Sequence, residues 1–297
     1  TGSQIMQTVT SLITGLAMGI TILVGQKIGE KRPEQAGDVI GSGICLFGVL
    51  AAVLTVLMIL GAGFLAGLMH APDEAFSQTV DYIRICSAGA VFIIAYNVLG
   101  SIFRGIGDSR MPLFTVAAAC VFNIGGDLLL VAGFHMGAAG AALATVAAQA
   151  ASVLLSLAVI RRRTLPFTIG KKNLRFERRL VGRILALGTP IALQDLLVSI
   201  SFLVILAIVN SMGVIASAGV GVAEKLCAFI MLVASAYMQS MSAFVAQNMG
   251  AGKPERAKRA LLYGIGTSLM AGVTLFYFSF FHGDAMAGIF ARDPQVV

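Results

Sequence analysis

Long apolar stretches, separated by short charged connections, dominate the chain. The stretches that lack a charged residue are Thr1–Gln26, Val39–Met69, Ile85–Phe103, Met111–Gly126, Leu128–Ile160, Leu196–Ala223, Leu226–Gly252 and Ala260–Gly283. A helix that crosses a bilayer needs about 20 apolar residues. Leu128–Ile160 is too long for one helix, and Gly133 to Gly137 predict a short turn within it. The pattern therefore predicts eight membrane-spanning helices, at residues 4–26, 40–68, 80–103, 112–133, 137–160, 184–209, 216–247 and 258–281.

Composition supports a membrane protein built from helices. Hydrophobic residues make up 58% of the chain and charged residues 12%, whereas soluble chains average about 45–50% and about 25%. This excludes ordinary soluble enzymes, disordered tails and nucleic-acid-binding modules. The strands of a membrane β-barrel are about ten residues of alternating polarity, and no segment of this chain alternates in that way. We therefore expect an all-α integral membrane protein.

The basic residues predict the orientation of these helices. Of the 21 Lys and Arg residues, 18 lie in four connections, at 27–38, 104–110, 161–183 and 253–259. The intervening connections contain almost none, so basic and non-basic connections alternate along the chain. Basic connections remain on the cytoplasmic side of a membrane. We therefore expect a multi-pass protein of the plasma (inner) membrane with these four loops in the cytoplasm. Contact of the 161–183 segment with anionic lipid is a further interpretation of its charge.

One segment occurs twice. Residues 24–36 (VGQKIGEKRPEQA) match residues 245–257 (VAQNMGAGKPERA) at six of 13 positions, with a constant offset of 221. Gly29 and Gly250 are predicted to close their helices in the left-handed conformation, and Pro33 and Pro254 to begin the next helices. Repeats of the same sense predict two halves related by an axis along the membrane normal. By this offset, the chain lacks the first helix and the last three helices of a twelve-helix protein.

The repeated segments and two other motifs resemble those of the multidrug and toxic compound extrusion (MATE) family of cation antiporters. The other two are Ser101–Pro112 (SIFRGIGDSRMP) and Asn123–Gln149, which begins NIGGDLLL. The resemblance implies two six-helix lobes. Residues 1–160 would form the N-terminal lobe with helices 2–6 of the family, 161–183 a basic cytoplasmic linker, and 184–297 a partial C-terminal lobe with helices 7–9.

Asp127 is the strongest candidate for a functional carboxylate within a predicted span. A charge at the bilayer centre costs about 2.5–3.5 kcal/mol, so it should face an interior. Asn123 lies one turn before it, and Thr145 lies at the same depth on the returning helix. Their oxygen atoms predict a site for a hard cation such as Na⁺, or for a proton. The MATE resemblance implies that these three residues couple transport to a cation, and a structural role for Asp127 is the alternative.

Two further carboxylates lie within spans. Asp195 follows Pro190, which predicts a bend, and has Gln194 beside it. Asp195 and Gln194 are candidates for a second proton site or a substrate site. Glu224 is a third candidate, although its neighbour Lys225 favours a neutralised or interface-facing pair. The MATE branch that carries a glutamate further along the helix of Asp195 has it where this chain has Val198.

These features favour a secondary active antiporter that exports drugs or other amphipathic organic compounds, often cationic, in exchange for Na⁺ or H⁺. The alternatives are a flippase of lipid-linked sugars with a related fold, and a membrane structural protein without transport activity. The sequence contains no Ser/His/Asp set, metal-ligand spacing or nucleotide loop, so we do not expect an enzyme. The expected partners are a small-molecule substrate and the bilayer, without nucleic acid or a bound cofactor, and the protein is expected to be a monomer.

Overall fold

The helices follow the apolar stretches of the sequence. The computed structural model describes residues 2–68, 73–163, 165–167, 170, 172–210 and 214–283. Its elements are α1 (Gly2–Gly29), α2 (Pro33–Leu68), α3 (Asp73–Ala88), α4 (Ala90–Ile106), α5 (Arg110–Asp127), the π-helix η1 (Leu128–Gly133), α6 (Gly137–Arg162), α7 (Arg178–Asn210), α8 (Val214–Gly250) and α9 (Pro254–Phe281). Within the described residues, seven helices are long and apolar enough to cross a membrane, or eight if the bent pair α3–α4 forms one span. The predicted all-α fold with eight spans is therefore confirmed.

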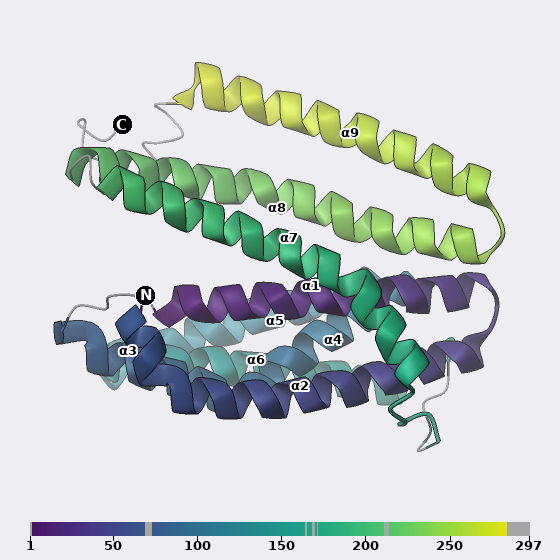
Figure 1. Cartoon of the computed structure of the whole chain (residues 1–297), viewed down its shortest axis with the longest axis horizontal. Helices are drawn as coiled ribbons and strands as arrows, with labels where there is room; N and C mark the ends of the chain where they lie inside the picture. The colour runs from purple at the N-terminus through teal and green to yellow at the C-terminus, as the bar shows by residue number, and fades with distance from the viewer. Residues whose placement is uncertain are drawn as a thin grey trace.

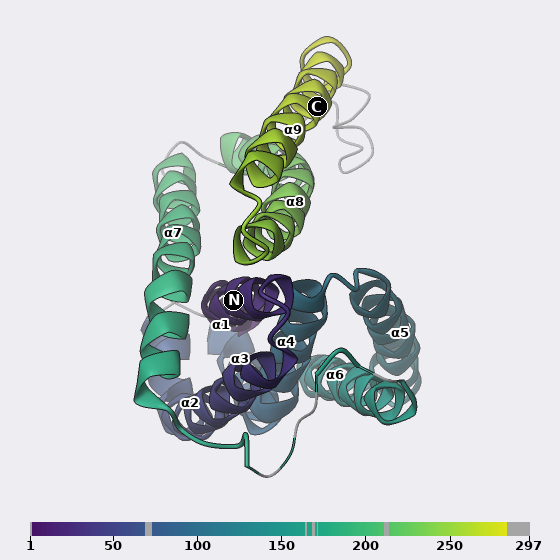
Figure 2. The same cartoon turned by 90° about the vertical axis from the view of Figure 1, so that its right-hand side faces the viewer.

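Helix α1 lies at the centre of the molecule. It contacts α2, α3, α4, α7 and α8, and Figures 1 and 2 show it between the α2–α6 group and the α8–α9 pair. Ile20, Leu23 and Val24 of α1 are fully buried, together with Ile40 of α2 and Ile184 of α7. Close packing against α7 depends on small residues, because a Cβ atom on Gly15 would lie 2.6 Å from the Ala192 Cα.

The predicted span 80–103 is bent rather than straight. It consists of α3 and α4, whose axes differ by 54° across a break at Gly89. Gly89 lies directly against the Val146 side chain of α6, where no Cβ atom would fit. The bend therefore lies at a contact between distant parts of the chain, which the apolar pattern does not reveal.

The two repeat junctions adopt matching conformations. The backbone is left-handed at Lys31 (φ 56°) and at Gly252 (φ 66°), which are 221 residues apart. Pro33 and Pro254 begin α2 and α9, as predicted. The prediction that Gly29 and Gly250 are left-handed is wrong, because both remain helical and the turn comes two residues later.

Gly29 and Gly250 instead allow α1 and α8 to touch. Gly29 lies against the carbonyl oxygen of Gln247, and Gly250 lies against the carbonyl oxygen of Gln26. The 221-residue offset relates Gln26 to Gln247 and Gly29 to Gly250, so the two contacts exchange under the repeat. Figure 1 shows α1 and α8 running in the same direction and converging toward the end that carries the repeat junctions. This reciprocity is what a two-fold relation between the repeats requires.

Gly25 and Ala246 lie where the two helices cross. They are also 221 residues apart, so each is the counterpart of the residue that it contacts. A Cβ atom on Gly25 would lie 3.2 Å from the Ala246 Cβ. The axis that relates α1 to α8 therefore passes between these two residues.

Candidate functional site

Asn123 and Thr145 connect α5 to α6. The Asn123 Nδ2 lies 3.4 Å from the Thr145 Oγ1, and that hydroxyl donates to the Ala141 carbonyl oxygen 2.9 Å away. The threonine oxygen thus accepts from the asparagine while its own proton is held by the helix backbone. The helices approach closely because Gly126 of α5 lies against Ala144 of α6. The structure therefore brings together two of the three residues predicted at this depth.

Asp127, the third residue, is the last residue of α5. Its Oδ1 atom is buried without a hydrogen-bond partner, and no hydrogen bond within the described part of the chain joins it to Asn123 or Thr145. The backbone changes from α to π geometry directly after it, a change that occurs often at functional sites. A buried polar atom without a partner costs about 1–3 kcal/mol, and more if charged. A proton or cation at Oδ1 would remove this cost.

Tyr82 belongs to the same cluster, although the sequence analysis did not select it. Its hydroxyl lies beside the Thr145 and Cys86 side chains and within electrostatic range of Asp127. Residue 82 stands near the start of the predicted span 80–103, at the end of the bundle where the span of Asp127 finishes. Comparison of the depths of all polar residues within the predicted spans would therefore have identified Tyr82.

Two other polar atoms near these helices are buried without a partner. Gln149 Oε1 lies one turn along α6 from Thr145, and Arg104 Nε lies near the end of α4. Arg104 also donates through Nη2 to the Ser101 hydroxyl at 2.9 Å. Among the described residues, α4, α5 and α6 thus each carry one buried side-chain polar atom without a hydrogen-bond partner. No group of three His, Cys, Asp or Glu side chains among the described residues could hold a metal ion.

The other predicted carboxylates lie on helices apart from this cluster. Asp195 on α7 is half-buried, and Gln194 beside it is exposed. Glu224 on α8 is half-buried, and no ion pair joins it to the exposed Lys225 in this part of the structure. Within the described ranges, neither α7 nor α8 contacts α5 or α6. Asp195 and Glu224 therefore do not share a site with Asp127.

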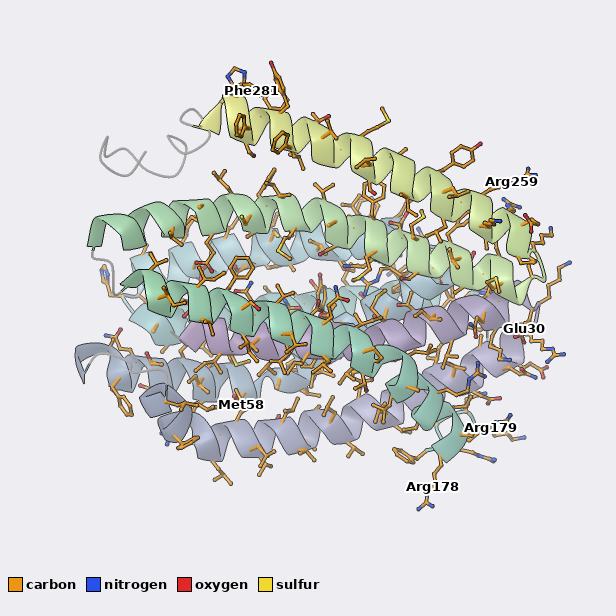
Figure 3. The ribbon with its side chains drawn as sticks, turned by 45° about the horizontal axis from the view of Figure 1, so that its top comes forward. Glu30, Met58, Arg178, Arg179, Arg259 and Phe281 are labelled. Atoms are coloured by element: carbon orange, nitrogen blue, oxygen red, sulfur yellow. The ribbon has the colours of Figure 1, made fainter. Side chains whose placement is uncertain are left out.

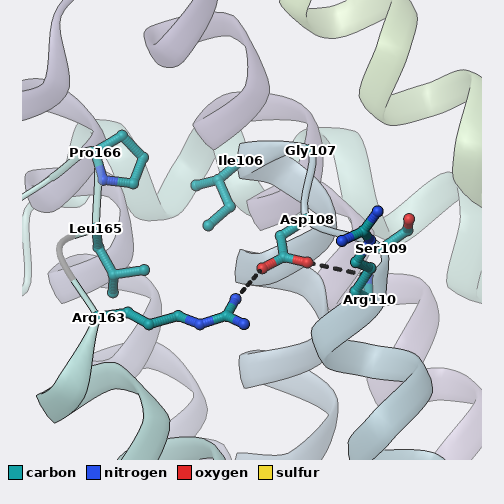
Figure 4. Close-up of a pocket in the computed structure, with 8 residues that line it drawn as sticks. All are labelled: Ile106, Gly107, Asp108, Ser109, Arg110, Arg163, Leu165 and Pro166. Carbon is teal, nitrogen blue, oxygen red and sulfur yellow. Dashed lines mark hydrogen bonds and ion pairs between the residues drawn. The ribbon is translucent and has the colours of Figure 1, made fainter.

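A pocket of about 390 Å³ lies at the loop between α4 and α5 (Figure 4). Asp108 organises it: Oδ1 accepts from the Arg110 and Met111 backbone amides at 3.0 and 3.1 Å, and Oδ2 pairs with Arg163 Nη1 at 3.2 Å. The carboxylate thus caps α5 and also holds the start of the linker that follows α6. Gly107 permits this turn with a left-handed φ of 87°. This arrangement is structural and provides no catalytic group.

Comparison with known proteins identifies the family. The profile of the MatE family matches residues 1–129 and 190–297, which is most of the chain. The chain belongs to the MATE family. Members of this family are membrane transporters and not enzymes.

Several MATE relatives align with nearly the whole chain. A probable multidrug resistance protein, YoeA of Bacillus subtilis, is 27% identical over 294 residues, which are 97% of this chain and 64% of YoeA. An FAD transporter of Shewanella oneidensis is 28% identical over 298 residues, covering 97% of this chain and 65% of that protein. This MATE chain therefore spans a little under two thirds of the length of these relatives.

The fold agrees with solved MATE structures. A transporter of the MOP superfamily from Pyrococcus furiosus superposes with a TM-score of 0.89 at 23% identity, over 98% of this chain and 65% of that one. The two-lobe architecture expected from the resemblance is therefore that of the family to which the chain belongs.

Proposed function

We propose that this chain forms the larger part of a secondary active antiporter that exports amphipathic organic compounds, often cationic, in exchange for Na⁺ or H⁺. It would act as a monomer in the plasma membrane, with its basic loops in the cytoplasm. Residues 1–160 would belong to one lobe and 184–297 to the other, joined by the linker 161–183. Family membership and the names of several relatives support export of small molecules.

The observation that carries the proposal is the buried Asp127 oxygen without a partner. A transporter coupled to a cation needs a group whose charge changes when the ion binds. In this proposal the Asp127 carboxylate is that group, and Asn123, Thr145 and Tyr82 would provide neutral polar atoms near it. Oxygen ligands of this kind suit hard cations, and a proton would neutralise the same carboxylate.

Neutralisation of Asp127 would act on the packing of its neighbours. While the carboxylate is charged, the burial of its Oδ1 atom without a partner is costly, and water or an ion must compensate it. Once it is neutral, the neighbouring helices can close around it. Such a change would alter the shape and charge of one lobe and so bias the rocking of the lobes that alternating access requires.

The substrate class is proposed from the relatives. A relative from Bacillus is described as a probable multidrug resistance protein, and one from Staphylococcus as a multidrug export protein. The Shewanella relative is described as an FAD transporter. A flat organic cation and a flavin dinucleotide have opposite charge, so transport assays with one of each distinguish the two substrate classes.

The decisive experiment uses the full-length protein in proteoliposomes with an imposed Na⁺ or pH gradient. We expect Asp127→Asn to remove most gradient-driven export of a fluorescent organic cation, because the amide retains the shape of the side chain but cannot change its charge. Protein yield and thermal stability should be preserved. Asp195→Asn tests the second candidate site, and Glu34→Gln, at an exposed carboxylate, is the matched control.

Full gradient-driven export by Asp127→Asn would show that Asp127 is structural. Loss of export in Asp195→Asn alone would move the coupling role to α7. Export that is insensitive to both gradients, or movement of a lipid-linked sugar instead, would favour the flippase alternative. An intact, correctly inserted protein that moves none of these compounds would favour a structural role.

A further inference from the structure

The segment that leads into α7 is fixed to the side of α2. Asn173 Nδ2 donates to Asp38 Oδ1 at 2.8 Å, and the Ser42 hydroxyl donates to the Arg175 carbonyl oxygen at 3.0 Å. The Asn173 carbonyl oxygen lies against Gly41, where a side chain would not fit. We refer to residues 172–179 as the interfacial strap.

These anchor points place the strap at a defined depth. Asp38 is the last charged residue of α2, and the helix is uncharged from Val39 to Leu68. The strap therefore contacts α2 where its charged end meets its apolar span. In a membrane this level corresponds to the boundary between lipid headgroups and acyl chains. Figure 2 shows the segment entering α7 at the periphery of the bundle, beside α2.

Two apolar side chains of the strap remain exposed. Leu174 is 46% exposed and Phe176 is 53% exposed, whereas Phe167, earlier in the same linker, is buried in the main core. The Arg175 and Glu177 amides each bond to the carbonyl oxygen two residues before them. Such bonds are typical of γ-turns, which keep the segment close to α2. Leu174 and Phe176 are thus two exposed apolar side chains, two residues apart, while the Arg175 carbonyl oxygen accepts from Ser42 and the Asn173 carbonyl oxygen packs against Gly41.

Basic side chains surround this apolar pair. Those of Lys172, Arg175, Arg178 and Arg179 are exposed, and none has an ion pair within the described ranges. Glu177 is the only acid of the strap. Figure 3 shows Arg178 and Arg179 projecting from the first turn of α7, away from the bundle. The positive end of a helix disfavours cations, so an external anion that paired with these two arginines would also relieve this repulsion.

We propose that the interfacial strap binds anionic phospholipid of the leaflet on the side of the basic loops. The phosphate groups would pair with Arg178, Arg179 and their basic neighbours, and Leu174 and Phe176 would enter the acyl boundary. Aromatic and apolar side chains beside Lys and Arg are typical of such interfacial anchors. Membrane topology alone accounts for the basic residues but not for the exposed apolar pair among them. The proposal does not depend on the transported substrate or on the coupling ion.

The absence of tryptophan from this chain allows a direct test. The full-length protein with Phe176→Trp is reconstituted with brominated phosphatidylglycerol or brominated phosphatidylcholine, and the emission of the unsubstituted protein is subtracted. We expect quenching by both lipids and preferential quenching by phosphatidylglycerol. Leu57→Trp, at an exposed position within the apolar span of α2, is the reporter control and should show no preference.

Charge variants then test whether Arg178 and Arg179 cause the preference for phosphatidylglycerol. Each Lys or Arg near an anionic surface contributes roughly fivefold in affinity, so Arg178→Gln with Arg179→Gln should weaken the preference for phosphatidylglycerol about 25-fold. Arg178→Lys with Arg179→Lys should retain most of it, which guards against loss through misfolding. The matched control, Lys258→Gln with Arg259→Gln, removes two exposed charges near the start of α9 and should leave the preference intact.

Four outcomes would overturn the proposal. One is equal quenching of Trp at position 176 by the two lipids, and another is an absence of quenching by either lipid. The third is an equal loss of preference in the Arg178/Arg179 and Lys258/Arg259 variants, which would indicate a general effect of net charge. Displacement by millimolar inorganic phosphate would also contradict it, because that result would identify a free-anion site.

Discussion

Replacing Gly250 with alanine should weaken the contact between α1 and α8 without unfolding either helix. A Cβ atom at this position would lie 2.8 Å from the Gln26 carbonyl carbon and 2.9 Å from its Cα. These are backbone atoms, so no side chain can rotate away and the helices must separate. Because the repeat relates Gly29 to Gly250, Gly29→Ala should have the same effect through Gln247.

The effect of Gly250→Ala has two energetic contributions. One acts on the separation of the α1 and α8 ends, and the other acts on helix formation. Overpacking of this kind costs about 1–3 kcal/mol, which shifts the ratio of closed to separated helix ends about 5–150-fold. Alanine also favours the helix over glycine by about 1 kcal/mol, but it does so whether or not α1 and α8 touch. The unfolding temperature should therefore change little, while the distance between the helix ends increases.

Spin labels at Glu34→Cys and Glu255→Cys can measure that distance in the full-length protein. Both positions are exposed in the first turns of α2 and α9, and the native cysteines would first be replaced by alanine. Electron–electron distance measurements should show a longer component in Gly250→Ala. Gly221→Ala is the matched control, because it is on the same helix and its added Cβ would meet no atom within 4 Å.

Two results would refute this reasoning. An unchanged distance distribution in Gly250→Ala would mean that the helix ends tolerate the methyl group by a local adjustment. The same lengthening in Gly221→Ala would mean that helix propensity, and not the contact with Gln26, controls the separation.

Two further predictions concern the loops on the side of the repeat junctions. Asp108→Ala removes the cap of α5 and should destabilise the protein by about 1 kcal/mol. Arg163→Gln removes only an exposed ion pair and should destabilise it by less. Thermal unfolding measures both effects, and equal losses of stability would contradict the capping role. The Lys27 hydrogen bond holds the pKa of Glu30 below its usual 4.5, so the ionised carboxylate contributes stability above about pH 4.5 that is lost as the pH falls through the lowered pKa. Glu30→Gln should therefore flatten the acid side of a plot of unfolding temperature against pH, and an unchanged plot would exclude this contribution.

The helices were predictable because their determinants are local. The length of each apolar stretch set the number of spans, and Pro33 and Pro254 marked the starts of α2 and α9. The bend at Gly89 was not predictable from the uncharged stretch that contains it, and the contact of Gly89 with Val146 involves another helix. The role of Gly29 also depends on a distant contact, with the backbone of α8. A single sequence does not distinguish a glycine that ends a helix from a glycine that allows a neighbouring backbone to approach.

The candidate site was predictable in part. Counting residues from the ends of two antiparallel spans brought Asn123 and Thr145 to one depth, and the structure joins them at 3.4 Å. The count assumed regular α-helix, so it did not foresee the π-helix directly after Asp127 or the lack of a hydrogen-bond partner for its buried Oδ1 atom. Tyr82 belongs to α3, so the positions of the carboxylates and of their nearest polar neighbours in the sequence do not indicate it.

The crossing at Gly25 and Ala246 resembles the centre of an isologous dimer interface, in which a residue meets its own copy. If the two halves were identical, each larger side chain at this position would face a copy of itself, so the added volume between the backbones would double. One methyl group, that of Ala246, lies between the two backbones here. Two identical halves could therefore carry only the smallest side chains at this position. Fusion of the halves into one chain removes that restriction, because one half can then gain a side chain while the other remains glycine.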